Sequence, residues 1–395
     1  MAPTASRLAW LDALRGPAAL AVALHHSAWT FIPDVWAHVD SRIDVGTWGV
    51  FVFFLVSGYI IPASLERGRD VRAFWTGRAF RLLPLLAAAL ALALLLAAYG
   101  AFDPNPGLAR RPPAVVAFGN LTMLQELLGV PAVIGVMWTL SYELAFYLMT
   151  AGLFAVGQER RSAGVAVALA VAAVPLGPLL PRAVVNGDVL AVLLGVAVLA
   201  AIAASALARG TAGRVAAVAG GLLGLALVVL GSRIGAWQGL TILAAMFAGT
   251  AVHRAEQGVI RWRTAVVAVL AVLVCGAPAK DDPGWAPALL LAAACFAGAF
   301  ALRRRRFPRW LAHLGVISFS LYLLHPLLLR LAPSLPVFFA VLVPLAYLTH
   351  RLIEAPAQRL GRRLARAASG GRGTRPVASA GSEVTGPPPP PGRGR

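Results

Sequence analysis

Apolar stretches of about twenty residues recur along this chain from Leu8 to Leu352, and they limit what it can fold into. A helix needs about 20 such residues to cross the roughly 30 Å hydrocarbon layer of a bilayer. One soluble core could not bury so many of them. Only 13% of the residues are charged, whereas soluble domains carry about 25%. The sequence therefore predicts an all-α, polytopic integral membrane helix bundle and excludes a soluble globular enzyme.

We expect about ten to twelve transmembrane helices, because short spans can merge or re-enter the bilayer. The candidate segments are 9–31, 46–65, 80–99, 133–156, 162–180, 187–208, 213–231, 237–253, 264–279, 285–302, 313–331 and 336–354. The longest loop, about 100–132, becomes semi-apolar in its second half. We expect that half to fold back over the outer mouth of the bundle.

Arginines concentrate in alternate loops, and this pattern predicts the orientation. The positive-inside rule places these loops and both termini in the cytoplasm, which requires an even number of spans. The formal net charge of +19 then reflects topology, and no nucleic-acid partner is expected. We expect a multi-pass protein of a bacterial-type plasma (inner) membrane. The loop arginines are Arg67, Arg69, Arg72, Arg78, Arg160, Arg161, Arg209, Arg214, Arg254, Arg261, Arg263 and Arg303 to Arg306.

Composition divides the chain into two parts. Residues 1–367 are predicted to form one transmembrane domain. Residues 368–395 are rich in Gly, Ser, Arg and Pro, cannot bury enough apolar surface to fold, and are predicted to be a disordered cytoplasmic tail. Cys275 and Cys295 lie in apolar stretches without a metal-binding spacing, so neither a disulfide nor a metal site is expected.

Ionisable side chains inside spans are costly, and they mark function by default. Arg15 and His26 are eleven residues apart, so on one helix they share a face and lie about 16 Å apart along the axis. His25 points about 100° away from His26. The spacing predicts an imidazole near the bilayer centre above a guanidinium at the cytoplasmic surface. A structurally satisfied histidine is the alternative.

Glu143 is the only carboxylate of segment 133–156. If this helix starts near Val133, Glu143 lies about 15 Å deep, at a level comparable with His26. The carboxylate would then orient the imidazole, which would act as a general base. A start at Trp138 leaves Glu143 only about 8 Å deep, and a helix-capping or neighbour-bonding role is then the alternative.

Four further positions have both a functional and a structural interpretation. Arg78 and Arg81 share a helix face and suit bidentate phosphate binding, although positive-inside anchoring explains them equally well. Ser57, in a small Ser-Gly pair, indicates close helix packing. His325 is the remaining deep imidazole, and we favour a structural role for it over a ligand contact.

Taken in order, these segments resemble the acyltransferase 3 superfamily of membrane O-acyltransferases. The resemblance covers residues 8 to about 360. The matching motifs are Leu11-Asp12-Ala13-Leu14-Arg15-Gly16 with His26, Phe53-Phe54-Leu55-Val56-Ser57-Gly58-Tyr59, Arg78-x-x-Arg81, Trp138-x-Leu-Ser141-x-Glu143, Ile317-Ser-x-Ser-Leu-Tyr322-Leu-x-His325 and Ile353-Glu354-x-Pro356.

The resemblance implies that an acyl group from cytoplasmic acyl-CoA is delivered to a hydroxyl, commonly on a sugar. It implies acyl-CoA binding for Arg15, Arg78 and Arg81 and catalysis for His26, with Glu143 at the family's glutamate. Two features depart from the family pattern. His25 stands beside His26, and the predicted number of spans is above the roughly ten usual in the family, so the segments between 187 and 302 align least securely with it. Supporting roles are expected within the same motifs for Asp12, Ser57, Trp138, Ser141, Tyr322 and His325.

We therefore expect a membrane O-acyltransferase that moves an acetyl or other short-chain acyl group from acyl-CoA to a carbohydrate hydroxyl, such as that of a cell-envelope glycan. No permanently bound cofactor is expected, since acyl-CoA is a donor substrate. Acylation of a glycosylated natural product is one alternative, and a transporter or flippase, which also places ionisable groups at mid-membrane, is another. The sequence leaves open the acyl chain, the acceptor, the oligomeric state and the choice between direct transfer and an acyl-histidine intermediate.

Overall fold

The computed structural model describes residues 9–370, and this part of the chain is helical and contains no strand. The predicted tail lies outside the described residues, except that residues 368–370 end the last helix. The helices are α1 (Ala9–Phe31), α2 (Pro33–Asp40), α3 (Val45–Gly68), α4 (Val71–Ala98), α5 (Pro113–Leu121), α6 (Trp138–Ala155), α7 (Ser162–Leu179), α8 (Asp188–Leu207), α9 (Gly210–Gly231), α10 (Ala236–Glu256), α11 (Trp262–Gly276), α12 (Trp285–Ala301), α13 (Arg309–Val316), α14 (Ser318–Leu328), α15 (Leu335–Thr349) and α16 (Ala355–Gly370).

The all-α, polytopic membrane architecture is confirmed. Between residues 9 and 370, seven helices are long and apolar enough to span a membrane, or eight if the bent pair α13–α14, broken by 66°, is one span. The predicted range of ten to twelve is higher than this count. Each predicted segment does coincide with a helix, but α1 carries Asp12 and Arg15, and α6 and α10 are mostly buried inside the protein. Helices surrounded by protein tolerate polar residues that lipid would exclude.

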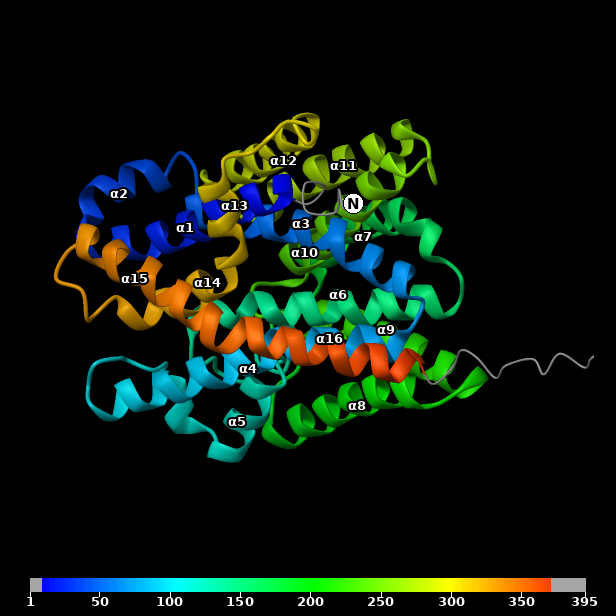
Figure 1. Ribbon diagram of the computed structural model, residues 1–395, viewed down its shortest axis with the longest axis horizontal. Coiled ribbons are helices and arrows are strands. Elements are labelled where there is room, and N and C mark those ends of the chain that lie inside the picture. Colours follow the sequence, from blue (N-terminus) through cyan, green and yellow to red (C-terminus); the bar gives the residue numbers. More distant parts are fainter. Residues whose placement is uncertain (1–8, 371–395) are drawn as a thin grey trace, which may run out of the picture.

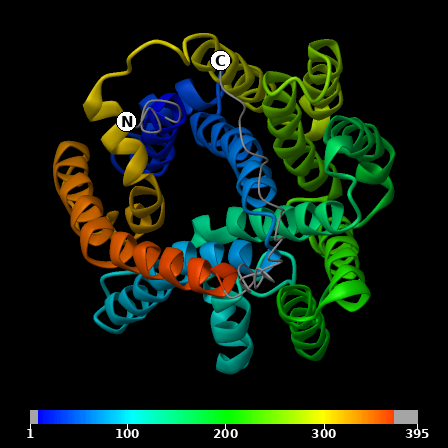
Figure 2. The same cartoon turned by 45° about the vertical axis from the view of Figure 1, so that its right-hand side comes forward.

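The long helices run side by side along the length of the molecule, with α6 crossing its middle (Figure 1). α1 packs against α3, α13 and α14, and α10 packs against α3 and α7. α15 and α16 follow each other along one rim of the bundle (Figure 2), where α16 packs against α4. The helices that carry the predicted motifs therefore gather in one half of the molecule.

Polar side chains cap the starts of two motif helices. Asp44 precedes α3, and its Oδ1 accepts a 2.7 Å hydrogen bond from the backbone N–H of Thr47. Asp70 precedes α4 and accepts from the N–H groups of Arg72 and Ala73. Such caps satisfy N–H groups that have no partner within the helix. They fix where α3 and α4 begin.

A π-helical turn, His350–Glu354, joins α15 to α16 without a break in the chain of helix. Pro356 follows it, and because proline lacks an N–H it cannot bond the carbonyl four residues earlier. The turn directs Glu354 inward, where its side chain is buried and accepts a hydrogen bond from Ser320 of α14. The Glu-x-Pro motif thus ties the α15–α16 rod to the α14 helix.

Segment 122–137, between α5 and α6, is packed into the protein. Met123, Leu124 and Leu127 are buried, and the Asn120 amide donates to the carbonyl oxygen of Pro131 at 3.0 Å. The Gln125 amide donates to the carbonyl of Met137 at 2.8 Å. Because this segment occupies the space before α6, the helix begins only at Trp138.

α3 and α10 approach each other closely at Gly58, as the small Ser-Gly pair predicted. A Cβ added at Gly58 would lie 1.8 Å from the carbonyl oxygen of Met246, and one at Gly249 would lie 2.3 Å from that of Leu55. The Thr250 hydroxyl donates a 2.7 Å hydrogen bond to the carbonyl of Gly58. Any side chain at Gly58 must push the two backbones apart.

We expect Gly58→Ala to destabilise the folded protein by at least the roughly 1–3 kcal/mol typical of overpacking, because the obstacle is backbone that cannot rotate away. The measurement is the thermal unfolding midpoint of the purified protein in detergent. Gly164→Ala, in α7, is the matched control, since a Cβ there meets nothing within 4 Å. Equal midpoints for the two variants would contradict the close approach.

Candidate active site

One cavity, of about 80 Å³, gathers most of the charged residues that the motifs single out. It lies among α1, α3, α4, α6 and α14. Its charged lining consists of Arg15, Arg78, Arg81 and Glu143. Three guanidinium groups against one carboxylate leave this lining net positive. We call it the arginine cavity.

The two arginines of α4 lie inside this helix. α4 begins at Val71, so Arg78 and Arg81 are about 11 and 15 Å along the helix axis. The segment predicted from sequence, 80–99, starts nine residues later and placed them at its cytoplasmic end. The guanidinium of Arg78 stacks 5.6 Å from the ring centroids of both Phe74 and Tyr147. These contacts hold a cation inside the bundle.

Arg15 enters the cavity from α1. Its Nη1 lies 3.6 Å from Oδ1 of Asp12, one turn earlier on the same helix. The charges that act on its guanidinium also include Arg81, Glu143 and Glu354. Asp12 therefore supports Arg15, and the ends of three separate motifs meet around this guanidinium.

Glu143 belongs to the arginine cavity and does not contact His26 among the described residues. Its Oε1 accepts hydrogen bonds from the hydroxyls of Tyr147, at 2.6 Å, and Ser57, at 3.3 Å. The expected His26–Glu143 pair rested on a helix that starts near Val133. Because α6 starts at Trp138, Glu143 lies about 8 Å further along it, at the level of the arginines.

His26 is paired with His325 instead. The Nδ1 of His26 lies 3.3 Å from the Nε2 of His325, and the ring centroids are 5.0 Å apart. His325, on α14, is fully buried. The sequence marks His325 only as a deep imidazole in a motif and favours a structural role for it. His325 was thus a candidate site residue, but the sequence did not predict that it contacts His26.

Backbone carbonyls define the tautomers of this pair. His26 Nδ1 lies 2.9 Å from the carbonyl oxygen of Val22, and His325 Nδ1 lies 3.3 Å from that of Leu321. A carbonyl only accepts, so both Nδ1 atoms carry the proton. The single Nδ1 proton of His26 is then shared between the Val22 carbonyl, at 2.9 Å, and the Nε2 of His325, at 3.3 Å, and the Nε2 of His26 keeps its lone pair. This is the protonation state that a general base needs.

Tyr322 contacts both the imidazole pair and the arginine cavity. It lines the cavity, and its ring centroid is 6.1 Å from that of His325 and 5.8 Å from that of Phe53. Its hydroxyl donates to the carbonyl of Val136 at 2.9 Å and lies 2.9 Å from the hydroxyl of Thr139. Tyr322 therefore lies next to both the arginine cavity and the imidazole pair.

Ser141 and Trp138 support the start of α6. The Ser141 hydroxyl donates to the carbonyl of Met123 at 2.6 Å and accepts from the N–H of Glu126 at 3.4 Å. Trp138 packs edge-on against Tyr142, with ring centroids 5.8 Å apart. Ser141 therefore holds segment 122–137 against α6, whereas Trp138 packs within α6.

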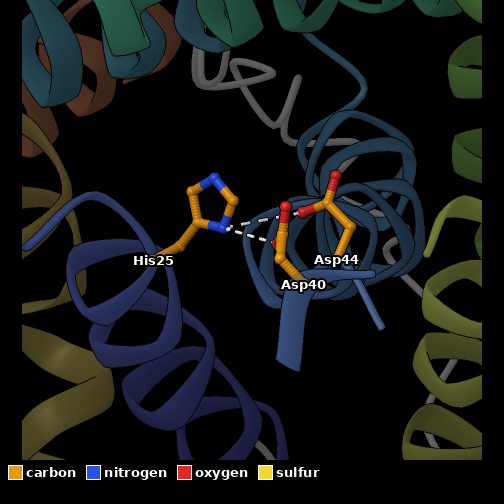
Figure 3. A group of neighbouring side chains, drawn as sticks. All are labelled: His25, Asp40 and Asp44. Atoms are coloured by element: carbon orange, nitrogen blue, oxygen red, sulfur yellow. Dashed lines mark ion pairs between the residues drawn. The ribbon is translucent and has the colours of Figure 1, made fainter. Parts of the chain in front are cut away.

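His25 takes part in a different cluster from His26, although the two rings are neighbours with centroids 5.2 Å apart. The imidazole of His25 faces Asp40 and Asp44, as Figure 3 shows. Its Nδ1 lies 3.3 Å from Oδ1 of Asp40 and 3.8 Å from Oδ1 of Asp44. The two adjacent histidines thus have different partners.

Comparison with known proteins gives two matches. The sequence model of a family described as "Acyltransferase domain" matches residues 8–348. The chain is also 31% identical to Nodulation protein 10 of Rhizobium leguminosarum bv. viciae over 190 residues, which cover 42% of this chain and 48% of that protein. The similarity to this relative thus spans about half of its length. No solved structure matches the chain.

Proposed function

Because the chain belongs to the acyltransferase 3 family of membrane acyltransferases, we propose that it moves an acetyl or other short-chain acyl group from cytoplasmic acyl-CoA to a hydroxyl of a carbohydrate acceptor. The observation that carries the proposal is the arginine cavity beside the His26–His325 pair. We place the reaction in a bacterial-type plasma membrane, with a cell-envelope glycan as the acceptor class.

The donor side of the proposal rests on Arg15, Arg78 and Arg81. Guanidinium groups bind phosphate oxygens through two parallel hydrogen bonds, and CoA carries several phosphates. A net positive cavity between packed helices strengthens this attraction, because protein screens charge less than water does. Glu143 holds its place through Ser57 and Tyr147 and balances part of the positive charge.

The acceptor side rests on His26. Its Nε2 removes the proton from the acceptor hydroxyl, and the oxygen attacks the thioester carbonyl carbon. The C–S bond then breaks, and the CoA thiolate takes the proton back from the imidazolium. His325 accepts the Nδ1 hydrogen bond and so keeps His26 in the tautomer with a free Nε2. The roughly 16 Å along α1 between Arg15 and His26 suits an extended acyl-pantetheine arm.

The test uses the purified full-length protein in detergent with radiolabelled acetyl-CoA and glycans extracted from the host's membranes. We expect free CoA to be released with time, together with label on a sugar hydroxyl, above the level of a His26→Ala preparation. A transporter or flippase would leave the thioester intact, so movement of a substrate without CoA release would refute the proposal. Mass spectrometry of glycans and small metabolites with and without the gene then separates an envelope glycan from a glycosylated natural product.

A further inference from the structure

Three side chains from separate elements converge at the outer end of α1. His25 comes from α1, Asp40 is the last residue of α2, and Asp44 caps the start of α3 (Figure 3). One nitrogen or oxygen atom from each lies within 4.8 Å of the other two. Ligand atoms around a tetrahedral Zn²⁺ at about 2.0–2.2 Å are roughly 3.4 Å apart. The 3.3 and 3.8 Å separations from His25 Nδ1 are therefore close to those of a formed site.

Two of these atoms are buried without a hydrogen bond. The Nδ1 of His25 and the Oδ1 of Asp40 are both shielded from solvent and have no hydrogen-bond partner. Buried polar atoms almost always have a partner, so an unsatisfied pair that points at each other requires an explanation. A cation between them would satisfy both atoms at once.

The charge around the cluster is negative. The charged groups that act on Asp40 are Asp44, Asp282 and Lys280. The Lys280 ammonium lies 2.6 Å from Asp282 and 4.0 Å from Asp44, so it is committed mainly to Asp282. One ammonium does not balance three carboxylates.

We propose that His25, Asp40 and Asp44 bind one divalent transition-metal cation of the Zn²⁺ class. One imidazole nitrogen and two carboxylate oxygens are a ligand set suited to such ions, with the fourth position left to water. The sequence predicted no metal site, since the two cysteines lack a metal-binding spacing. These ligands are instead spread over 25–44 and meet only because the short α2 turns the chain back towards α1.

Such an ion has a structural consequence for the proposed base. It would cross-link α1, α2 and α3 and hold the His25 ring in place. This ring already packs on Gly46, where an added Cβ would lie 2.8 Å from its Cγ. Because the His25 and His26 rings are neighbours, the ion would fix the outer end of the helix turn that carries His26. We assign the ion a positioning role.

The test measures binding of Zn²⁺ alone, without acyl-CoA, so its result does not depend on the proposed function. The full-length protein is purified with a tag free of histidine, stripped with a chelator and titrated with Zn²⁺ against a fluorescent competitor. We expect about one Zn²⁺ per chain and at least a 10-fold loss of affinity in Asp40→Asn, which keeps the side-chain shape. Bound Zn²⁺ should raise the thermal unfolding midpoint of the wild type but not of this variant.

Asp34→Asn, an exposed position on the same helix α2, is the matched control and should bind as the wild type does. Lys280→Met should tighten binding, because it removes the competing ammonium from the carboxylates. X-ray absorption should report one nitrogen and two protein oxygens around the metal. Equal Zn²⁺ affinity in the wild type and Asp40→Asn, with both proteins folded, would overturn the proposal. Ca²⁺ binding with the same affinity in the wild type and in His25→Ala would also overturn the proposal, since no imidazole would then be a ligand.

Discussion

Replacing His26 by alanine is expected to lower the rate of acyl transfer by about 10²–10⁴-fold, the range that a positioned general base contributes. The Nε2 of His26 is the free basic atom of the imidazole pair, because Nδ1 is committed to Val22 and His325. The measurement is the rate of CoA release in the presence of acceptor. His38→Ala, on the exposed face of α2, is the control and should retain activity. Full activity of His26→Ala would remove the proposed base.

The pH–rate profile separates the two possible partners of His26. His325→Ala removes the atom that accepts from His26 Nδ1, so the profile of kcat should shift and the rate should fall. Glu143→Gln should leave the profile unchanged, because Glu143 bonds Ser57 and Tyr147. If Glu143→Gln shifts the profile as much as His325→Ala does, the carboxylate acts on His26 and our assignment is wrong.

Replacing Arg81 by methionine should raise the KM for acyl-CoA by about 10–100-fold, because each charged hydrogen bond to phosphate contributes roughly 1.5–3 kcal/mol. The phosphates do not react, so kcat should change much less. Methionine keeps an unbranched, though shorter, side chain and removes its charge. Arg15→Met should also raise the KM for acyl-CoA, since the guanidinium groups of Arg15 and Arg81 line the same cavity.

A truncated donor makes this second prediction specific. Acyl-pantetheine lacks the nucleotide phosphates, so its KM should be the same in the wild type and in Arg81→Met. Arg160→Met, at an exposed position outside the cavity, is the control and should leave the KM for acyl-CoA unchanged. An equal rise in KM for both donors would mean that Arg81 only maintains the shape of the cavity.

The sequence predicted the secondary structure better than the number of spans. Apolar length is a property of each segment, so every predicted span coincides with a helix. Whether a helix faces lipid or protein depends on its neighbours. α6 and α10 are mostly surrounded by protein, and they are not apolar enough to count as membrane spans by hydropathy alone. The start of α6 depended likewise on where segment 122–137 packs.

For the site, the motifs identified individual residues but not their partners. Arg15, Arg78, Arg81 and Glu143 were each singled out, and the structure brings them to one cavity. The pairing of His26 with His325 joins residues 299 positions apart and depends on the relative depth of α1 and α14. Depth along one helix can be calculated from sequence, whereas the offset between two helices cannot.

The committed Nδ1 of His26 bears on the covalent alternative, in which the acyl group passes through the imidazole. Only Nε2 is free to be acylated, and acylation there while Nδ1 keeps its proton produces a cationic acyl-imidazolium. A neutral adduct requires that proton to move to His325, whose Nε2 is the nearest basic atom. The two-step route therefore makes the second histidine a proton acceptor, whereas the direct route needs it only as a hydrogen-bond acceptor.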